Sequence, residues 1–264
     1  MVFVSLMLTT ILAWAYVVHL AFGMTPEPAM AGMDMNMGME MAVTPMPGAW
    51  NAADFGFAVL MWSVMMIGMM APSVAPTILL YATVGRFYAA QSRSAAAPGK
   101  PFAATGWFAA GYFLAWIIFS VGAALAQTAL TSAMLVTPML KSASMPLSGA
   151  VLVIAGLYQW SPWKVACLKQ CRAPLSFIQS HGGFKPEASA SLRLGLRHGL
   201  YCVGCCWALM LLLFVLGVMN LVWIAALAAL VLIEKLWARG VLASRAAGIA
   251  SIAGGIYLIA ESWV

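Results

Sequence analysis

Residues 199–236 have the sequence GLYCVGCCWALMLLLFVLGVMNLVWIAALAALVLIEKL, and this stretch decides the fold. No charged residue precedes Glu234 within it. Because a membrane-spanning helix needs about 20 mostly apolar residues, the stretch is long enough for two such helices in succession. We therefore expect spans at 199–217 and 219–236, with Glu234 and Lys235 at the end of the second, where they can reach water or each other.

The rest of the chain has the same character. Its 264 residues are 64% hydrophobic and 8% charged, and its mean hydropathy is +0.96, which is far more apolar than a soluble domain. The same window marks five further segments: 2–22, 56–82, 104–126, 143–162 and 247–263. The sequence therefore predicts an all-α, polytopic transmembrane helix bundle of about seven spans.

The distribution of lysine and arginine predicts the orientation, because cytoplasmic loops retain positive residues. With the N-terminus inside and the C-terminus outside, only Lys141 of the 13 basic residues faces outward. The others are spread over three short membrane-flanking loops, so the net charge of +6 indicates topology and no nucleic-acid partner. We expect a multi-pass protein in the lipid bilayer of a bacterial inner (cytoplasmic) membrane.

Three parts make up the expected organisation. Residues 1–22 form the first transmembrane helix or a signal anchor; a cleaved signal peptide is disfavoured because the segment lacks a basic start. Residues 23–55 form an extracytoplasmic, Met-rich loop that is disordered in isolation, since it is Pro-rich at both ends and poor in large apolar residues other than methionine. Residues 56–264 form a six-helix membrane domain.

Methionine occupies every second position of MDMNMGMEM, residues 33–41, in the outer loop. A thioether is a soft, neutral ligand that selects Cu(I) and needs no deprotonation before it binds. The candidate ligands are Met33, Met35, Met37, Met39 and Met41. Met-rich surfaces also bind proteins adaptably, which is the alternative interpretation.

Methionines recur in MWSVMMIGMMAPS, residues 61–73, within the second span. At helical spacing Met61, Met65 and Met69 form one stripe, and Met66 and Met70 form a parallel one. We expect this ladder to line part of a metal path, with ordinary packing as the alternative.

Five cysteines fall on the expected cytoplasmic side. Cys167 and Cys171 lie in SPWKVACLKQCRAP, where Ser161 can cap and Pro162 can begin a short helix that ends at Pro174. Such a helix places both thiols on one face. We expect it to pack near the base of the span that begins at residue 199.

A second group of potential ligands lies in RHGLYCVGCCWALM, residues 197–210. On a helix, His198, Cys202, Cys205 and Cys206 share an arc of about 100°. Thiolates and imidazole are ligands for Cu(I) or Zn(II), and clustered thiols also serve redox chemistry. Ordinary helix packing is the alternative for these small residues.

Three blocks of this sequence resemble those of a bacterial family of predicted metal-binding integral membrane proteins. They are MWSVMMIGMMAPS, GLYQWSPWKVACLKQCRAP and the stretch 199–236. The resemblance covers residues 56–263 and excludes the outer Met-rich loop. It implies a helical membrane architecture and metal binding through Cys167, Cys171, Cys202, Cys205 and Cys206, and it supplies no reaction.

We expect a copper(I)-handling membrane protein that binds, transfers or transports a soft metal ion, with a cuproenzyme or metallochaperone as partner. Zinc and iron are the alternative metals. Two other classes stay open: a metal-dependent or thiol-redox membrane enzyme, and a scaffold or subunit that docks a protein on the Met-rich loop. We favour a non-enzyme, because nucleophile-elbow, phosphate-loop and HExxH motifs are all missing from the sequence.

Overall fold

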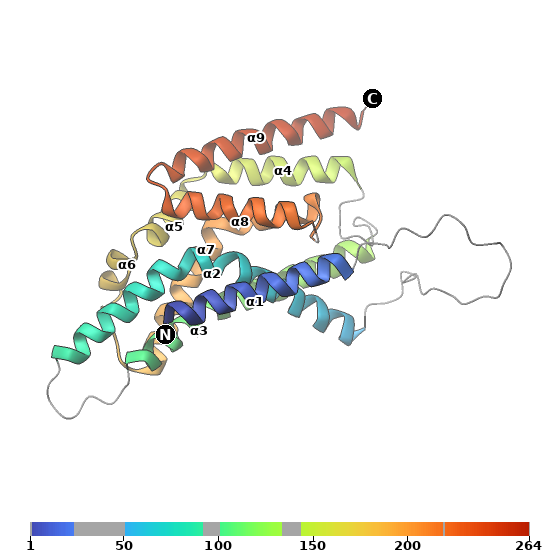
Figure 1. Cartoon of the computed structure of the whole chain (residues 1–264). Helices are drawn as coiled ribbons and strands as arrows, with labels where there is room; N and C mark the ends of the chain where they lie inside the picture. Colours follow the sequence, from blue (N-terminus) through green and yellow to red (C-terminus); the bar gives the residue numbers. More distant parts are fainter. Residues whose placement is uncertain (1, 24–50, 92–100, 134–143, 219, 264) are drawn as a thin grey trace, which may run out of the picture.

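The computed structural model describes residues 2–23, 51–91, 101–133, 144–218 and 220–263, and this part of the chain is helical without strands. Figure 1 shows the longer helices lying roughly along one direction, with the start of the first helix and the end of the last helix at opposite ends of the bundle. The helices are α1 (Val2–Gly23), α2 (Ala52–Gln91), α3 (Pro101–Ser132), α4 (Met145–Gln159), α5 (Pro162–Arg172), α6 (Pro174–Ser180), α7 (Ala188–Leu216), α8 (Leu221–Leu236) and α9 (Gly240–Glu261). The all-α prediction is confirmed for these residues.

Five of the expected spans coincide with described helices that are long and apolar enough to cross a membrane: Val2–Ala21, Ala52–Tyr88, Ala104–Ser132, Ala188–Leu216 and Gly240–Glu261. The expected spans 143–162 and 219–236 correspond to α4 and α8, which have 15 and 16 residues. At about 1.5 Å per residue, each is shorter than a bilayer core of about 30 Å. The total of seven spans and the sides of the termini stay predictions.

The helix α7 is central, because α3, α4, α5 and α8 all contact it, and it packs closely on α3. A Cβ atom at Gly195 of α7 would lie 1.9 Å from the Phe108 carbonyl oxygen, and one at Gly111 of α3 would lie 2.1 Å from the Leu192 carbonyl oxygen. Small residues allow helix backbones to approach this closely. This contact fixes the position of α7 along α3, and therefore the positions of the cysteines that α7 carries.

A second close helix pair lies at the side of the bundle, where α4 and α9 run side by side (Figure 1). Glycines again line the contact between the two helices. Gly156 lies against the Gly248 carbonyl oxygen, and Gly149 lies against the Gly255 carbonyl oxygen. The helix α8 contacts α9, α2 and α7. The helix α8 therefore connects this pair to α2 and α7.

Two prolines, Pro72 and Pro76, lie inside α2 without ending it. Pro72 has no N–H for the carbonyl of Gly68, four residues earlier. That oxygen accepts a hydrogen bond from the Trp14 indole N–H of α1 at 3.2 Å instead. A neighbouring helix therefore satisfies the freed carbonyl, as is usual for prolines in apolar helices.

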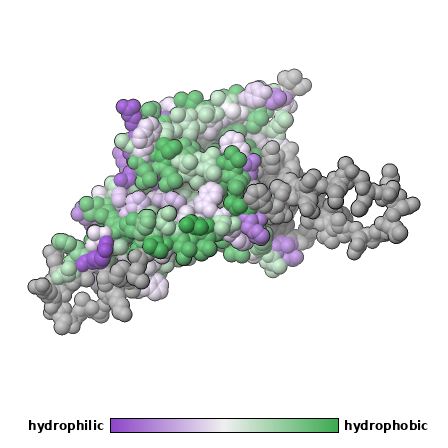
Figure 2. All heavy atoms as spheres, viewed as in Figure 1, coloured by the Kyte–Doolittle hydropathy of each residue, from purple (hydrophilic) through white to green (hydrophobic). Residues whose placement is uncertain are grey.

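The surface differs between the flanks and the ends of the bundle. Figure 2 shows hydrophobic side chains over the flank of the helices and hydrophilic ones gathered towards the two ends. Large apolar side chains such as Leu12, Leu157 and Ile256 are more than half exposed. This arrangement is compatible with insertion in a membrane.

Candidate metal centre

Three thiols from two helices converge in the interior. The sulfur atoms of Cys171 on α5 and of Cys202 and Cys205 on α7 all lie within 4.8 Å of one another. Cys202 and Cys205 are buried, and Cys171 is partly buried. Among the described residues, this is the one group of three or more His, Cys, Asp or Glu side chains that could hold a metal ion.

The local sequence explains how the α5 thiol reaches this position. The Ser161 hydroxyl accepts a hydrogen bond from the Lys164 backbone N–H, Pro162 occupies the first turn, and the helix ends at Arg172, before Pro174. These are the start and the stop that the sequence predicted. The helix packs on α7 as expected, and its turn spacing brings Cys171 to Cys202 and Cys205.

The spacing of the three sulfur atoms fits a soft metal ion. A metal–sulfur bond of about 2.3 Å places three sulfur ligands about 4 Å apart around one ion. The observed separations, all within 4.8 Å, need only a small adjustment of side chains. Thiolates are ligands for Cu(I), Zn(II) and iron–sulfur clusters, so the cluster can bind metal.

Cys206 and Cys167 lie next to this cluster but outside it. The Cys206 thiol donates a hydrogen bond to the Cys202 carbonyl oxygen at 2.9 Å, and Cys205 donates to the same oxygen at 3.1 Å. Cys167 lies against Gly204, where a Cβ atom would be 2.9 Å from its sulfur atom. Burial raises the pKa of the Cys167 thiol, and the neighbouring Cys205 raises this pKa further.

His198 has different surroundings from those that the helical arc suggested. Its ring centroid lies 4.8 Å from that of Phe177, 5.9 Å from that of Tyr112 and 6.1 Å from that of Phe108. The side chain is buried, and Nδ1 has no hydrogen-bond partner among the described residues. His198 is therefore enclosed by aromatic rings and lies outside the sulfur cluster.

Cys202 has two polar neighbours that sequence reasoning missed. The Lys235 ammonium of α8 donates to the Cys202 sulfur atom at 2.9 Å and to the Ser73 hydroxyl of α2 at 2.9 Å. The Tyr112 hydroxyl of α3 lies 3.0 Å from the same sulfur atom. Side chains from α3, α5, α7 and α8 therefore meet at Cys202. The spacing of these residues in the sequence did not predict that they would meet.

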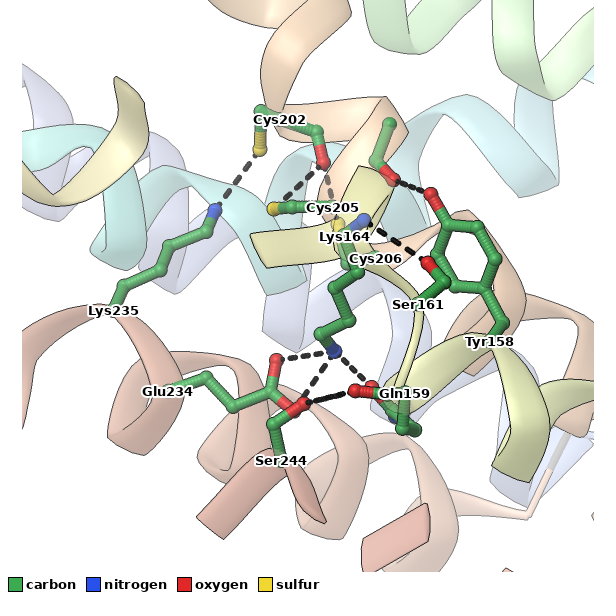
Figure 3. Close-up of polar contacts among 11 residues, drawn as sticks. Tyr158, Gln159, Ser161, Lys164, Cys202, Cys205, Cys206, Glu234, Lys235 and Ser244 are labelled. Atoms are coloured by element: carbon green, nitrogen blue, oxygen red, sulfur yellow. Dashed lines mark hydrogen bonds and ion pairs between the residues drawn. The ribbon is translucent and has the colours of Figure 1, made fainter. Parts of the chain in front are cut away.

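A buried ion pair anchors α5 beside the cluster (Figure 3). Lys164 of α5 lies 2.8 Å from a carboxylate oxygen of Glu234 on α8, and each side chain is 1% exposed. The Lys164 ammonium also donates to the amide oxygen of Gln159, which accepts from the Ser244 hydroxyl at 3.0 Å. The expectation that Glu234 and Lys235 reach water or each other is wrong, because they point to different partners on α5 and α7.

The five methionines of the expected ladder are all buried in α2. Met61, Met65, Met66, Met69 and Met70 are between 0% and 4% exposed. Met70 is the last methionine of the stripe and lies one turn before Ser73. The Ser73 hydroxyl lies 3.9 Å from the Met70 sulfur atom. The loop candidates Met33, Met35, Met37, Met39 and Met41 lie outside the described residues.

Comparison with known protein families places this chain among proteins that handle copper. Residues 59–258 match the model of the PpoB2 family, which is described as a copper chaperone, and the chain belongs to that family. The match includes the methionine stripe and the cysteines but begins after the outer loop. No curated protein and no solved structure matches the chain.

Proposed function

We propose that this protein is a membrane-embedded copper chaperone that binds Cu(I) through Cys171, Cys202 and Cys205. The observation that carries the proposal is the convergence of three sulfur atoms from α5 and α7 within 4.8 Å. Membership of the copper chaperone family supports copper as the cargo. The ion is bound and passed on, so it is cargo and not a resident cofactor.

The ligand set favours Cu(I) over the alternative metals. The cluster holds three thiols and no carboxylate. Thiolates are ligands for both Cu(I) and zinc, but structural zinc is almost always bound by four ligands, one more than the cluster offers. A buried cluster also limits the access of water and oxidants to the bound ion. Cys206 and Cys167 are close enough on the chain to serve as exchange ligands while the ion enters or leaves.

The surroundings of the cluster support a membrane location. Five described helices are apolar and long enough to cross a bilayer, and α1 and α9 are largely exposed along their length. We propose that α5, α6 and the basic residues around them lie on the cytoplasmic side of a bacterial inner membrane. Residues 23–55 then face outward, as in the expected three-part organisation, and their methionines collect Cu(I).

The two types of sulfur ligand suit a directional route for the ion. Thioethers bind Cu(I) without adding negative charge, whereas thiolates add Coulomb attraction in a site with little screening. Copper therefore moves from weak ligands in the loop and the α2 stripe to stronger ones in the thiol cluster. A cuproenzyme or a soluble metallochaperone is the partner that takes the ion from there.

Two neighbouring cysteines on α5 provide a matched test of the proposed site. Cys171→Ser and Cys167→Ser are the same substitution on the same helix at two partly buried positions, but only Cys171 belongs to the sulfur cluster. We expect purified wild-type protein loaded with Cu(I) under reducing conditions to retain stoichiometric copper. Cys171→Ser should lose most of it, and Cys167→Ser should keep most of it.

Elemental analysis after removal of free metal measures this difference. Equal copper in both variants, or equal loss from both, would contradict the assignment of the site to the Cys171, Cys202 and Cys205 cluster. Circular dichroism and elution volume in detergent check that both variants retain the helical fold.

A further inference from the structure

Lys235 places a positive charge directly beside the sulfur cluster. Its ammonium nitrogen lies 2.9 Å from the Cys202 sulfur atom and 2.9 Å from the Ser73 hydroxyl, and the side chain is 7% exposed. In the described part of the chain the one salt bridge joins Lys164 to Glu234, so Lys235 pairs with no carboxylate there. Figure 3 shows Lys235 directed at Cys202, whereas Lys164 is directed at Glu234 and Gln159.

The ammonium also lies between the two sets of sulfur ligands. Ser73, its second partner, has its hydroxyl 3.9 Å from the Met70 sulfur atom at the end of the α2 stripe. The contacts therefore run from Met70 to Ser73, from Ser73 to Lys235 and from Lys235 to Cys202. An ion that follows these contacts from the methionine stripe to the thiols passes this ammonium.

This position has a consequence for the charge of the ion that binds. A metal about 2.3 Å from the Cys202 sulfur atom lies no more than about 5 Å from the Lys235 nitrogen. Coulomb repulsion is proportional to the product of the two charges, and it is poorly screened in a buried site. At the same position, the ammonium therefore opposes a divalent ion twice as strongly as a monovalent one.

We propose that Lys235 is a specificity-determining residue that makes the thiol cluster prefer the monovalent soft ion Cu(I) over Zn(II). The type of ligand does not make this choice, because thiolates are strong ligands for both metals. The fixed positive charge supplies the discrimination without occupying a ligand position. This inference rests on the proposed function, since it requires that Cys202 binds the metal.

Neutral substitutions at Lys235 test the inference. Lys235→Met preserves the length and the apolar stem, and Lys235→Gln preserves hydrogen bonding, while both remove the charge. Lys235→Arg keeps the charge, and Lys169→Met removes a charge from an exposed position on α5. Each purified protein is titrated with Cu(I) and with Zn(II) separately, each against a chromophoric chelator of known affinity, and the ratio of the two affinities is compared.

We expect Lys235→Met and Lys235→Gln each to shift the affinity ratio toward Zn(II) by at least about tenfold. Lys235→Arg and Lys169→Met should stay near the wild-type ratio. If the wild type binds copper but a folded neutral Lys235 variant has the wild-type affinity ratio, the inference about Lys235 is overturned and the proposed function still stands. A wild-type protein without copper, or with copper that Cys171→Ser does not affect, would overturn the proposed function and this inference with it.

Discussion

The sulfur cluster and the methionine stripe are both buried groups of soft ligands, but they are built differently. The cluster consists of Cys171 on α5 and of Cys202 and Cys205 on α7. Lys235 of α8 and Tyr112 of α3 contact it. The stripe belongs to α2 alone, and its five side chains are part of the hydrophobic core. Convergence from several helices defines a site more strongly than a periodic stripe on one helix, because ordinary packing also produces the stripe.

The largest effect that we expect comes from the cluster. Cys202→Ser removes the thiol that Lys235 and Tyr112 both contact and that lies beside Cys171 and Cys205. Loss of supporting groups around a metal commonly weakens binding about 10- to 100-fold, so loss of a ligand should cost at least about 100-fold in Cu(I) affinity. Competition with a Cu(I) chelator measures this change.

The matched comparison for Cys202→Ser replaces all five alternating loop methionines, Met33, Met35, Met37, Met39 and Met41, with leucine. We expect this variant to lose less copper at equilibrium than Cys202→Ser, because neutral thioethers hold the ion more weakly than thiolates. The opposite order, with copper lost from the five-methionine variant and retained by Cys202→Ser, would make the loop the true binding site and the cysteines structural.

A smaller effect should follow from the stripe. Met66→Leu together with Met70→Leu removes two sulfur atoms while nearly conserving volume, so the core should tolerate the change. We expect the copper bound at equilibrium to stay the same and the rate of loading to fall several-fold. Time courses of Cu(I) uptake by protein in vesicles measure this rate. The control replaces Met7 and Met145, which are exposed on α1 and α4; loading rates equal to this control would show that the stripe is only packing.

Much of the fold could be predicted from sequence because its signals are local. The Ser161 cap, Pro162 and Pro174 fix the limits of α5, and the apolar stretch 199–236 contains most of α7 and all of α8. The spacing of Cys167 and Cys171 placed both thiols on one helix, but it could not tell which one joins Cys202 and Cys205 of α7. The lengths of α4 and α8 were overestimated because the hydrophobic window extends across the residues that cap these helices.

Contacts between helices could not be predicted in this way. A helical arc placed His198 with the cysteines, but it could not show that Phe108, Tyr112 and Phe177 from other helices enclose the imidazole. Glu234 and Lys235 are adjacent in sequence, yet their side chains diverge to Lys164 and Cys202. Which partner a buried charge finds depends on the packing of whole helices, and no spacing within one helix records it.

X-ray absorption spectroscopy at the copper edge of the loaded protein tests the central claim most directly. If Cu(I) is bound by Cys171, Cys202 and Cys205, the spectrum should be that of Cu(I) with about three sulfur ligands at about 2.3 Å and no imidazole scattering. The number of sulfur ligands should fall in Cys171→Ser and stay the same in Cys167→Ser. A spectrum with an imidazole ligand, or one that Cys171→Ser leaves unchanged, would contradict the account.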